Sequence, residues 1–305
     1  MKILLAEYAS HYAETDPSLA LEGRAMFSTL RESFERVGHT VYSPTPGTDF
    51  KSEIRHIGSQ CDNGLVIAPD DILFSYTKAL EDVCRNIGCN SISVALCANK
   101  QKTGNILAGQ DIDVPREVTS GKRVIKDISG AGALHMKYAD EEPLDAQFGQ
   151  EYVNGEHLSV SLIVNRVTGE ACLYYTGEGP LLLAVNRQDI RILDNGQFVY
   201  CGGETPITHP RHDEIVSVAK KTALALGCQG YIGIDLIVSS DRIVVVDVNP
   251  RPTGSIIGIA RCISEEIASL ILDASYGKQI GPVTYTQRVT FDKSGNVSII
   301  DDVGP

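Results

Sequence analysis

The stretch YIGIDLIVSSDRIVVVDVNPRPTGS, residues 231–255, contains two runs of branched aliphatic residues separated by a short polar turn. Such runs are typical of paired β-strands, and each contains an aspartate, Asp235 in the first and Asp247 in the second. An ionised carboxylate inside an apolar sheet costs several kcal/mol unless it is paired or coordinated. These two acids therefore indicate a functional site within the hairpin.

A metal site is the interpretation that we favour for this hairpin. Asp247 and Asn249 are two residues apart on one strand, so both side chains point to one face. Mg²⁺ prefers hard oxygen ligands, and one or two carboxylates plus phosphate oxygens suit it. If Asp235 shares that face, the turn between the strands must hold an odd number of residues, three or five. The alternative is that the strands are half exposed and the acids simply face water.

Two lysines are candidates for binding phosphate. Lys126 ends the apolar run RVIK and precedes a glycine loop with Gly130 and Gly132, where backbone N–H groups are accessible. Lys100 follows another predicted strand. Taken alone, a lysine before a loop, such as Lys126, is usually just solvated, and the alternative for Lys100 is a solvated residue at the start of a helix.

The segment FGQEYVNGEHLSV, residues 148–160, is a candidate for nucleotide binding. An extended chain can offer backbone N–H and C=O groups to an adenine edge, and the following Glu156 can bind ribose hydroxyls. Taken alone, the segment is more simply an ordinary hairpin with an Asn-Gly turn.

Composition narrows the class of protein. The chain has 305 residues and a formal net charge of −12, which argues against nucleic acid and an anionic membrane surface as partners. It has no run of 18 apolar residues and no apolar N-terminal stretch long enough for a signal peptide. The eight cysteines form no C-x-x-C pair, which is typical of reduced thiols in a cytoplasmic protein.

Periodicity predicts an open, mainly parallel α/β lobe followed by a strand-rich region. The expected strands of the first lobe are residues 2–6, 40–43, 64–68 and 91–96, and its expected helices are 21–37 and 76–87. Further helices are expected near 100–109, 212–226 and 261–275, with an antiparallel sheet between them and a strand-rich tail.

In order along the chain, NK, VIK…SGAGA, QEYVNGE, GIDLIV and VDVNPRP resemble the signature series of the ATP-grasp ligases. The resemblance covers residues 99 to about 255 and implies four parts: an N-terminal Rossmann-like α/β lobe at 1–98, a helix, small lid and adenine linker at 99–157, a C-terminal antiparallel-sheet lobe at 158–275, and a tail at 276–305. It also implies a role for each matching residue: phosphate for Lys100 and Lys126, adenine for Gln150, Tyr152 and Val153, ribose for Glu156, Mg²⁺ or Mn²⁺ for Asp235, Asp247 and Asn249, and the acyl substrate or the transferring phosphoryl group for Arg251.

The resemblance implies an ADP-forming enzyme that joins a carboxylate to an amine through an acyl phosphate, with Lys126 and Arg251 as its catalytic cations. The segments NPRPTGS, NRQDI and GGETP resemble an archaeal branch that includes the tyramine–glutamate ligase of methanofuran biosynthesis. Glutamate and tyramine are therefore the expected substrates, with Arg187 and Arg251 holding the diacid and the loop at 8–24 closing over the cleft. The oligomeric state stays open, with a homodimer as one option.

Other classes of function fit the sequence less well. A dinucleotide-binding G-x-G-x-x-G, a P-loop and the kinase H-R-D and D-F-G motifs are all absent from the sequence. A non-catalytic nucleotide-binding module, or an ATP-grasp ligase for another pair of substrates, remains the alternative. The intact set of proposed metal ligands favours an enzyme over such a module.

Overall fold

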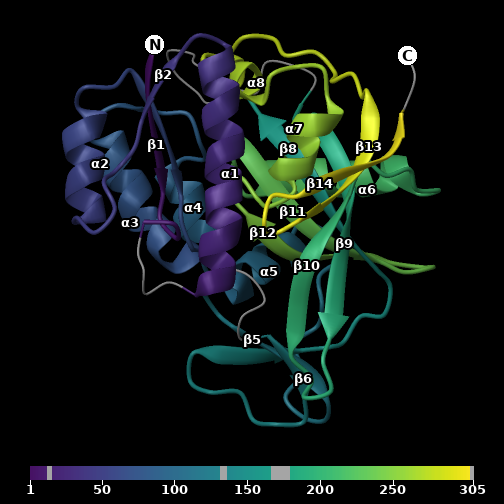
Figure 1. Ribbon diagram of the computed structural model, residues 1–305. Coiled ribbons are helices and arrows are strands. Elements are labelled where there is room, and N and C mark those ends of the chain that lie inside the picture. Colours follow the sequence, from purple (N-terminus) through teal and green to yellow (C-terminus); the bar gives the residue numbers. More distant parts are fainter. Residues whose placement is uncertain (12–15, 131–135, 166–178, 303–305) are drawn as a thin grey trace.

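The computed structural model describes residues 1–11, 16–130, 136–165 and 179–302. These residues form three sheets: a four-stranded parallel sheet, a three-stranded antiparallel sheet and a seven-stranded antiparallel sheet. The small sheet lies at one end of the large one, and the parallel sheet lies beside it (Figure 1). This is the ATP-grasp architecture that the sequence predicts.

The N-terminal lobe contains the sheet β2-β1-β3-β4 with helices on both faces (Figure 1). Alternate residues of β1 enter two separate hydrophobic cores: Leu4 packs with α2 and α3, while Ile3 and Leu5 pack with α1. The strands are β1 (Lys2–Glu7), β2 (Thr40–Tyr42), β3 (Asn63–Ile67) and β4 (Arg85–Asn86), and the helices are α1 (Pro17–Arg36), α2 (Phe50–Gly58) and α3 (Asp70–Glu81).

Helix positions in this lobe differ from those predicted. Helix α1 begins at Pro17 because the Asp16 side chain accepts hydrogen bonds from the N–H groups of Ser18 and Leu19. The loop after β1 is therefore shorter than predicted, and residues 12–15 of it lie outside the described residues. Helix α2 was not predicted, and α3 begins six residues before the predicted position.

The strand predicted at residues 91–96 is wrong, since this segment forms helix α4 (Ser91–Cys97). Asn90 caps the helix by accepting a hydrogen bond from the N–H of Ser93. The alternating polar and apolar residues of SISVAL imitate a strand, but in the helix Val94 and Cys97 share the buried face. Tertiary burial and the cap outweigh the local pattern.

A helix and a small sheet follow the first lobe, where the sequence analysis expected a lid. Helix α5 (Lys100–Ala108) begins this region, as predicted, and leads to the small sheet β6-β5-β7. Its strands are β5 (Arg123–Asp127), β6 (Lys137–Ala139) and β7 (Gln147–Gln150). Before this sheet, Glu117 makes an isolated bridge to Gln150.

The large sheet has the order β12-β11-β8-β9-β10-β13-β14. The last two strands come from the tail and extend this sheet by pairing β13 with β10. The predicted helix near 261–275 is two helices, α7 and α8. The elements are β8 (Glu156–Val164), β9 (Leu181–Ile192), β10 (Phe198–Thr205), α6 (His212–Ala225), β11 (Gly230–Val238), β12 (Ile243–Asn249), α7 (Ile256–Cys262), α8 (Ile267–Ser275), β13 (Gln287–Asp292) and β14 (Val297–Asp302).

The two faces of the large sheet have different surroundings. One face, with Leu158 and Leu236, packs into the core that includes α6, and we call it the helix face. The other face carries Asp235 and is called the acid face. Among the described helices, none has both the length and the hydropathy that a membrane span requires.

Candidate active site

Asp235 and Asp247 are direct cross-strand partners in the β11–β12 hairpin, so both side chains point to the acid face. This confirms the predicted shared face, but the predicted odd turn is wrong. Four residues, 239–242, connect Val238 to its partner Ile243. The register then shifts by one residue between the pairs Leu236–Val245 and Asp235–Asp247, which makes Val246 the extra residue of a β-bulge. The bulge offsets the even turn.

The two carboxylates have different environments. Asp235 Oδ1 accepts a hydrogen bond from Gln188 Nε2 at 2.9 Å, and Oδ2 accepts one from Asn249 Nδ2 at 3.2 Å. Burial, together with the charge of Asp247, raises the pKa of Asp235 to about 7. Burial would also raise the pKa of Asp247, but the charges of Lys100 and Lys126 outweigh it and lower that pKa. Asp247 is therefore the carboxylate that stays ionised.

Asp247, Lys100, Asp70 and Arg251 form a chain of charges between the lobes. Lys100 Nζ lies 2.5 Å from Asp247 Oδ2 and 3.8 Å from Asp70 Oδ2. Arg251 Nε donates to Asp70 Oδ1 at 3.2 Å. Asp70 is 2 % exposed, and its Oδ2 atom has no hydrogen-bond partner among the described residues. A single carboxylate at the start of α3 thus contacts cations from both α5 and the segment after β12.

Lys126 crosses from the small sheet to the large one. Its Nζ donates to the backbone oxygen of the bulge residue Val246 at 2.9 Å. Burial lowers the pKa of Lys126 to about 8. Gln150 lies on the same face of the small sheet and lines a small cavity with Lys100, Lys126 and Asp247. The structure therefore brings both predicted phosphate lysines to Asp247.

The acid face becomes apolar beyond the bulge. Val153 packs there with Ile237 and Val244, and Val246 adds to the cluster. Tyr152 is 36 % exposed, and its ring lies 4.8 Å from the ring of Tyr138. Of the predicted glycine loop, Gly132 lies outside the described residues. The predicted adenine linker thus borders an apolar surface next to Lys126.

The structure does not bring Glu156 and Arg187 into this group. Glu156 pairs with Val238 and Arg187 pairs with Leu158, which places both side chains on the helix face. They lie 3.8 Å from each other there, and Arg187 also pairs with Glu204 at 2.8 Å. Successive side chains along a strand point to opposite faces of the sheet. A residue directly next to one on the acid face therefore points to the helix face.

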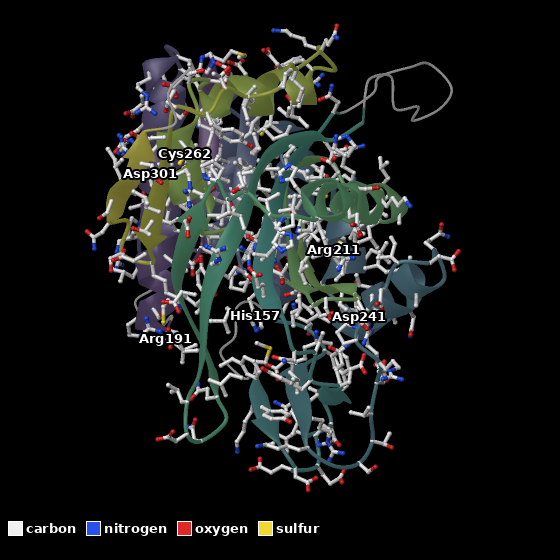
Figure 2. All side chains as sticks on the ribbon, turned by 90° about the vertical axis from the view of Figure 1, so that its right-hand side faces the viewer. His157, Arg191, Arg211, Asp241, Cys262 and Asp301 are labelled. Carbon is white, nitrogen blue, oxygen red and sulfur yellow. The ribbon has the colours of Figure 1, made fainter. Side chains whose placement is uncertain are left out.

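The neighbours of these two residues, His157 and Gln188, point to the acid face instead. His157 is the cross-strand partner of Ile237, and Gln188 contacts Asp235. Figure 2 shows His157 where the large sheet meets the small one. Burial lowers the pKa of His157, which favours the neutral imidazole. Both residues were missed by the sequence analysis, because they lie on strands other than that of Asp235 and only the register between the strands places them on its face.

Asp70 was also missed, because the predicted helix at 76–87 left it in an unassigned loop. Its signal is its position directly after the parallel strand β3, in the segment IAPDD. Ligands of open α/β sheets bind at the carboxyl ends of their strands, so acids at such positions are candidates for a site.

The donor set suits a cation that is shared with a phosphate. Among the described side chains, no group of three or more His, Cys, Asp or Glu residues could hold a metal alone. Asp235 and Asp247 supply two carboxylates, and the amide of Asn249 contacts Asp235. Mg²⁺ commonly takes one or two carboxylates and completes its shell with phosphate oxygens and water. The raised pKa of Asp235 reflects buried negative charge, which a divalent cation would offset.

Comparisons with known proteins agree with this geometry. A family model described as an ATP-grasp domain matches residues 97–255. The chain is 31% identical to the tyramine–L-glutamate ligase of Methanocaldococcus jannaschii, over 95% of this chain and 94% of that protein. Among solved structures, an ATP-grasp superfamily protein from Archaeoglobus fulgidus aligns with a TM-score of 0.77 at 26% identity, covering 96% of this chain and 92% of that one. The L-amino acid ligase from Bacillus licheniformis shares the fold with a TM-score of 0.67 at 14% identity, covering 95% and 78%.

Proposed function

Because the chain belongs to the ATP-grasp family of carboxylate–amine ligases, we propose that it joins L-glutamate to tyramine at the expense of ATP. Full-length similarity to a tyramine–L-glutamate ligase supports this pair of substrates. The observation that carries the ligase chemistry is the direct pairing of Asp235 with Asp247 beside Lys100 and Lys126.

ATP lies between the two antiparallel sheets in this proposal. Its base packs against the apolar cluster of Val153, Ile237 and Val244, and the backbone near Tyr152 contacts the adenine edge. Gln150 and Lys126 face the same space, so the phosphates extend from there toward Asp247. Although burial lowers the pKa of Lys126 to about 8, this value is still above 7, so the lysine is mainly protonated at pH 7 and can contribute a positive charge.

Asp235, Asp247 and Asn249 would hold Mg²⁺ or Mn²⁺. When bound, the ion neutralises phosphate charge and orients the γ-phosphate. Lys100 pairs with Asp247 Oδ2 in the structure, so its positive charge lies beside the residues that would hold the ion. There it would be available to a phosphate oxygen, with Asp70 close enough to retain it.

Arg251 orients the acid substrate. It follows Asn249 in the chain, and its guanidinium is fixed by Asp70 at 3.2 Å and by the backbone oxygen of Pro252 at 3.2 Å. A substrate carboxylate paired with such a fixed cation can attack the γ-phosphate, which forms an acyl phosphate and ADP. The amine then displaces phosphate from the acyl carbon.

The test is ADP release measured against a panel of acids crossed with a panel of amines. L-Glutamate with tyramine should release ADP and phosphate and form an amide, and omission of either substrate should remove amide formation. If another pair is active while this pair is not, the substrates are wrong and the ligase stands. If no acid stimulates ADP release by a protein shown to bind Mg²⁺-ATP, the ligase proposal fails.

A further inference from the structure

Helix α1 places a carboxylate, Glu22, against the loop that follows β12, the strand that carries Asp247 and Asn249. A Cβ atom added to Gly254 would lie only 2.3 Å from Glu22 Oε1, so the carboxylate lies directly on the loop backbone. Gly254 is three residues beyond Arg251. Glu22 is half-buried, and it forms no hydrogen bond or ion pair within the described part of the chain.

The neighbouring acid Glu7 behaves differently. Its two carboxylate oxygens accept hydrogen bonds from the N–H groups of Ala9 and Ser10, at 2.9 and 2.7 Å. It lies against Gly23, where an added Cβ would be 2.4 Å from Glu7 Oε1. Glu7 therefore fixes the chain after β1, whereas no described group donates to the oxygens of Glu22.

The position of Glu22 relative to the nucleotide follows from β11. Along the acid face of this strand, Ile237 borders the proposed base site, Asp235 belongs to the metal site, and Gly233 and Tyr231 come next. A Cβ added to Gly233 would lie 2.5 Å from the Thr253 side chain, so the loop that carries Gly254 covers this end. Glu22 thus lies beyond the metal site, on the side away from the base.

Independent features at this end point to a polar ligand. Tyr231 is 1 % exposed, and its hydroxyl has no partner within hydrogen-bond geometry among the described residues, although the hydroxyls of Ser161, Ser255 and Thr253 are its neighbours. Burial, followed by the charge of Glu22, raises the pKa of Tyr200, which places this ring near the same carboxylate. Lys293 Nζ lies 5.6 Å from the centre of the Tyr200 ring. A carboxylate, a buried hydroxyl and an aromatic ring therefore gather at this end, and Arg251 acts on the carboxylate.

We propose that Glu22 binds the ammonium group of the amine substrate and accepts a proton from it. The proposal rests on the ligase function above, which requires a neutral amine. One proton passes from nitrogen to Glu22, and the freed lone pair attacks the acyl carbon to form the C–N bond. The bond from the acyl carbon to the phosphate oxygen breaks, phosphate leaves with the electron pair, and it takes the second proton from nitrogen. Glu22 then returns its proton to solvent.

The charges around Glu22 suit both binding of the ammonium group and acceptance of its proton. Burial raises the pKa of Glu22, while Lys293 and Arg251 oppose the rise. A carboxylate with a raised pKa is a stronger base than an exposed one, which favours proton transfer from an ammonium group. Arg251 is shared with the acid substrate, so the amine nitrogen and the acyl carbon are brought to adjacent positions.

Two reactions of the Glu22→Gln variant distinguish proton transfer from the amine from the earlier formation of the acyl phosphate. The first is amide formation from L-glutamate, tyramine and Mg²⁺-ATP. The second replaces tyramine with hydroxylamine, which is a neutral nucleophile at pH 7 and needs no base to trap the acyl phosphate. Removal of a general base costs about 10²- to 10⁴-fold. We expect a loss of that size in amide formation, a raised KM for tyramine, and hydroxamate formation within about twofold of wild type.

Three comparisons complete the experiment. Glu32→Gln removes an exposed acid from the same helix and should leave both reactions unchanged. Glu22→Asp retains a carboxylate and should recover part of the amide rate, and a thermal melt of each variant verifies the fold. Equal loss of both reactions in folded Glu22→Gln, or undiminished amide formation, would overturn the role of Glu22. Absence of hydroxamate with the wild-type protein would overturn the ligase function itself.

Discussion

Lys100 Nζ and Asp247 Oδ2 lie 2.5 Å apart, so the lysine neutralises the carboxylate that a divalent cation would use. Asp247→Asn removes this ion pair together with a proposed metal ligand. We expect metal-dependent ADP release to fall at least about 100-fold, because transition-state charge loses its support.

The same variant should lose only about 2 kcal/mol of unfolding free energy, since Lys100 keeps Asp70 as a partner and Asp235 is freed from a like charge. Asp241→Asn, in the exposed turn of the same hairpin, is the matched control. Chemical denaturation and ADP release measure both effects. Retained turnover with strong destabilisation would show that Asp247 acts through packing alone.

The pKa of Asp235 near 7 makes stability depend on pH with a defined sign. The folded state binds a proton that the unfolded state has released above about pH 4, so the stabilising contribution of protonated Asp235 is lost as pH rises through 7. Asp235→Asn should therefore match wild type at pH 4 and exceed its stability at pH 8 by about 4 kcal/mol. Denaturation at both pH values is the measurement, and a stability difference that is independent of pH would contradict the assignment.

Asp70→Asn tests the carboxylate that holds Arg251. The variant keeps the size of the side chain but removes the charge that fixes the guanidinium. We expect KM for the acid substrate to rise about tenfold or more, as for the loss of a charge-assisted hydrogen bond. Asp71→Asn changes the exposed neighbour on the same turn of α3 and should leave KM unchanged. Equal KM values for the two variants would remove Asp70 from the site.

Arg187→Ala and Gln188→Ala form a pair that tests the two faces of the sheet. Arg187 lies on the helix face in an ion pair with Glu204, so its loss should cost about 0.5–1 kcal/mol of stability and leave kcat/KM within about twofold. Gln188 donates to Asp235, and its loss should weaken Mg²⁺-dependent turnover. Steady-state kinetics measure kcat/KM for both variants. A large decrease found only in Arg187→Ala would indicate that Arg187 binds the substrate after all.

The fold class and the hairpin that carries Asp235 and Asp247 could be predicted because long buried runs and spaced motifs are local features of the sequence. Asp235 and Asp247 were expected on one face, and the register confirms it. The strand predicted at 91–96 failed because helix α4 depends on the Asn90 cap and on burial by distant elements. Neither contribution is visible in the alternation of polar and apolar residues.

Parts of the site escaped the sequence analysis for a geometric reason. Asp70 contacts Lys100 and Arg251, which are 30 and 181 residues away in the chain. The sequence around Asp70 gives no indication of such long-range contacts. Glu156 and Arg187 were expected in the site, whereas the strand register presents His157 and Gln188 there. Sequence motifs locate a strand to within one or two residues. The face of the sheet to which each side chain points depends on the exact register, because a shift of one residue reverses it.

The bulge at Val246 also constrains insertions and deletions in this hairpin. The turn at 239–242 and the bulge together set the alignment of Asp235 with Asp247. A relative whose turn is one residue longer could lose the bulge and keep its acids aligned, but it would also lose the backbone oxygen that Lys126 contacts. We therefore expect length changes in the turn to occur together with a compensating change at position 246 and a different residue at position 126. Engineered loops grafted into this hairpin should have four residues.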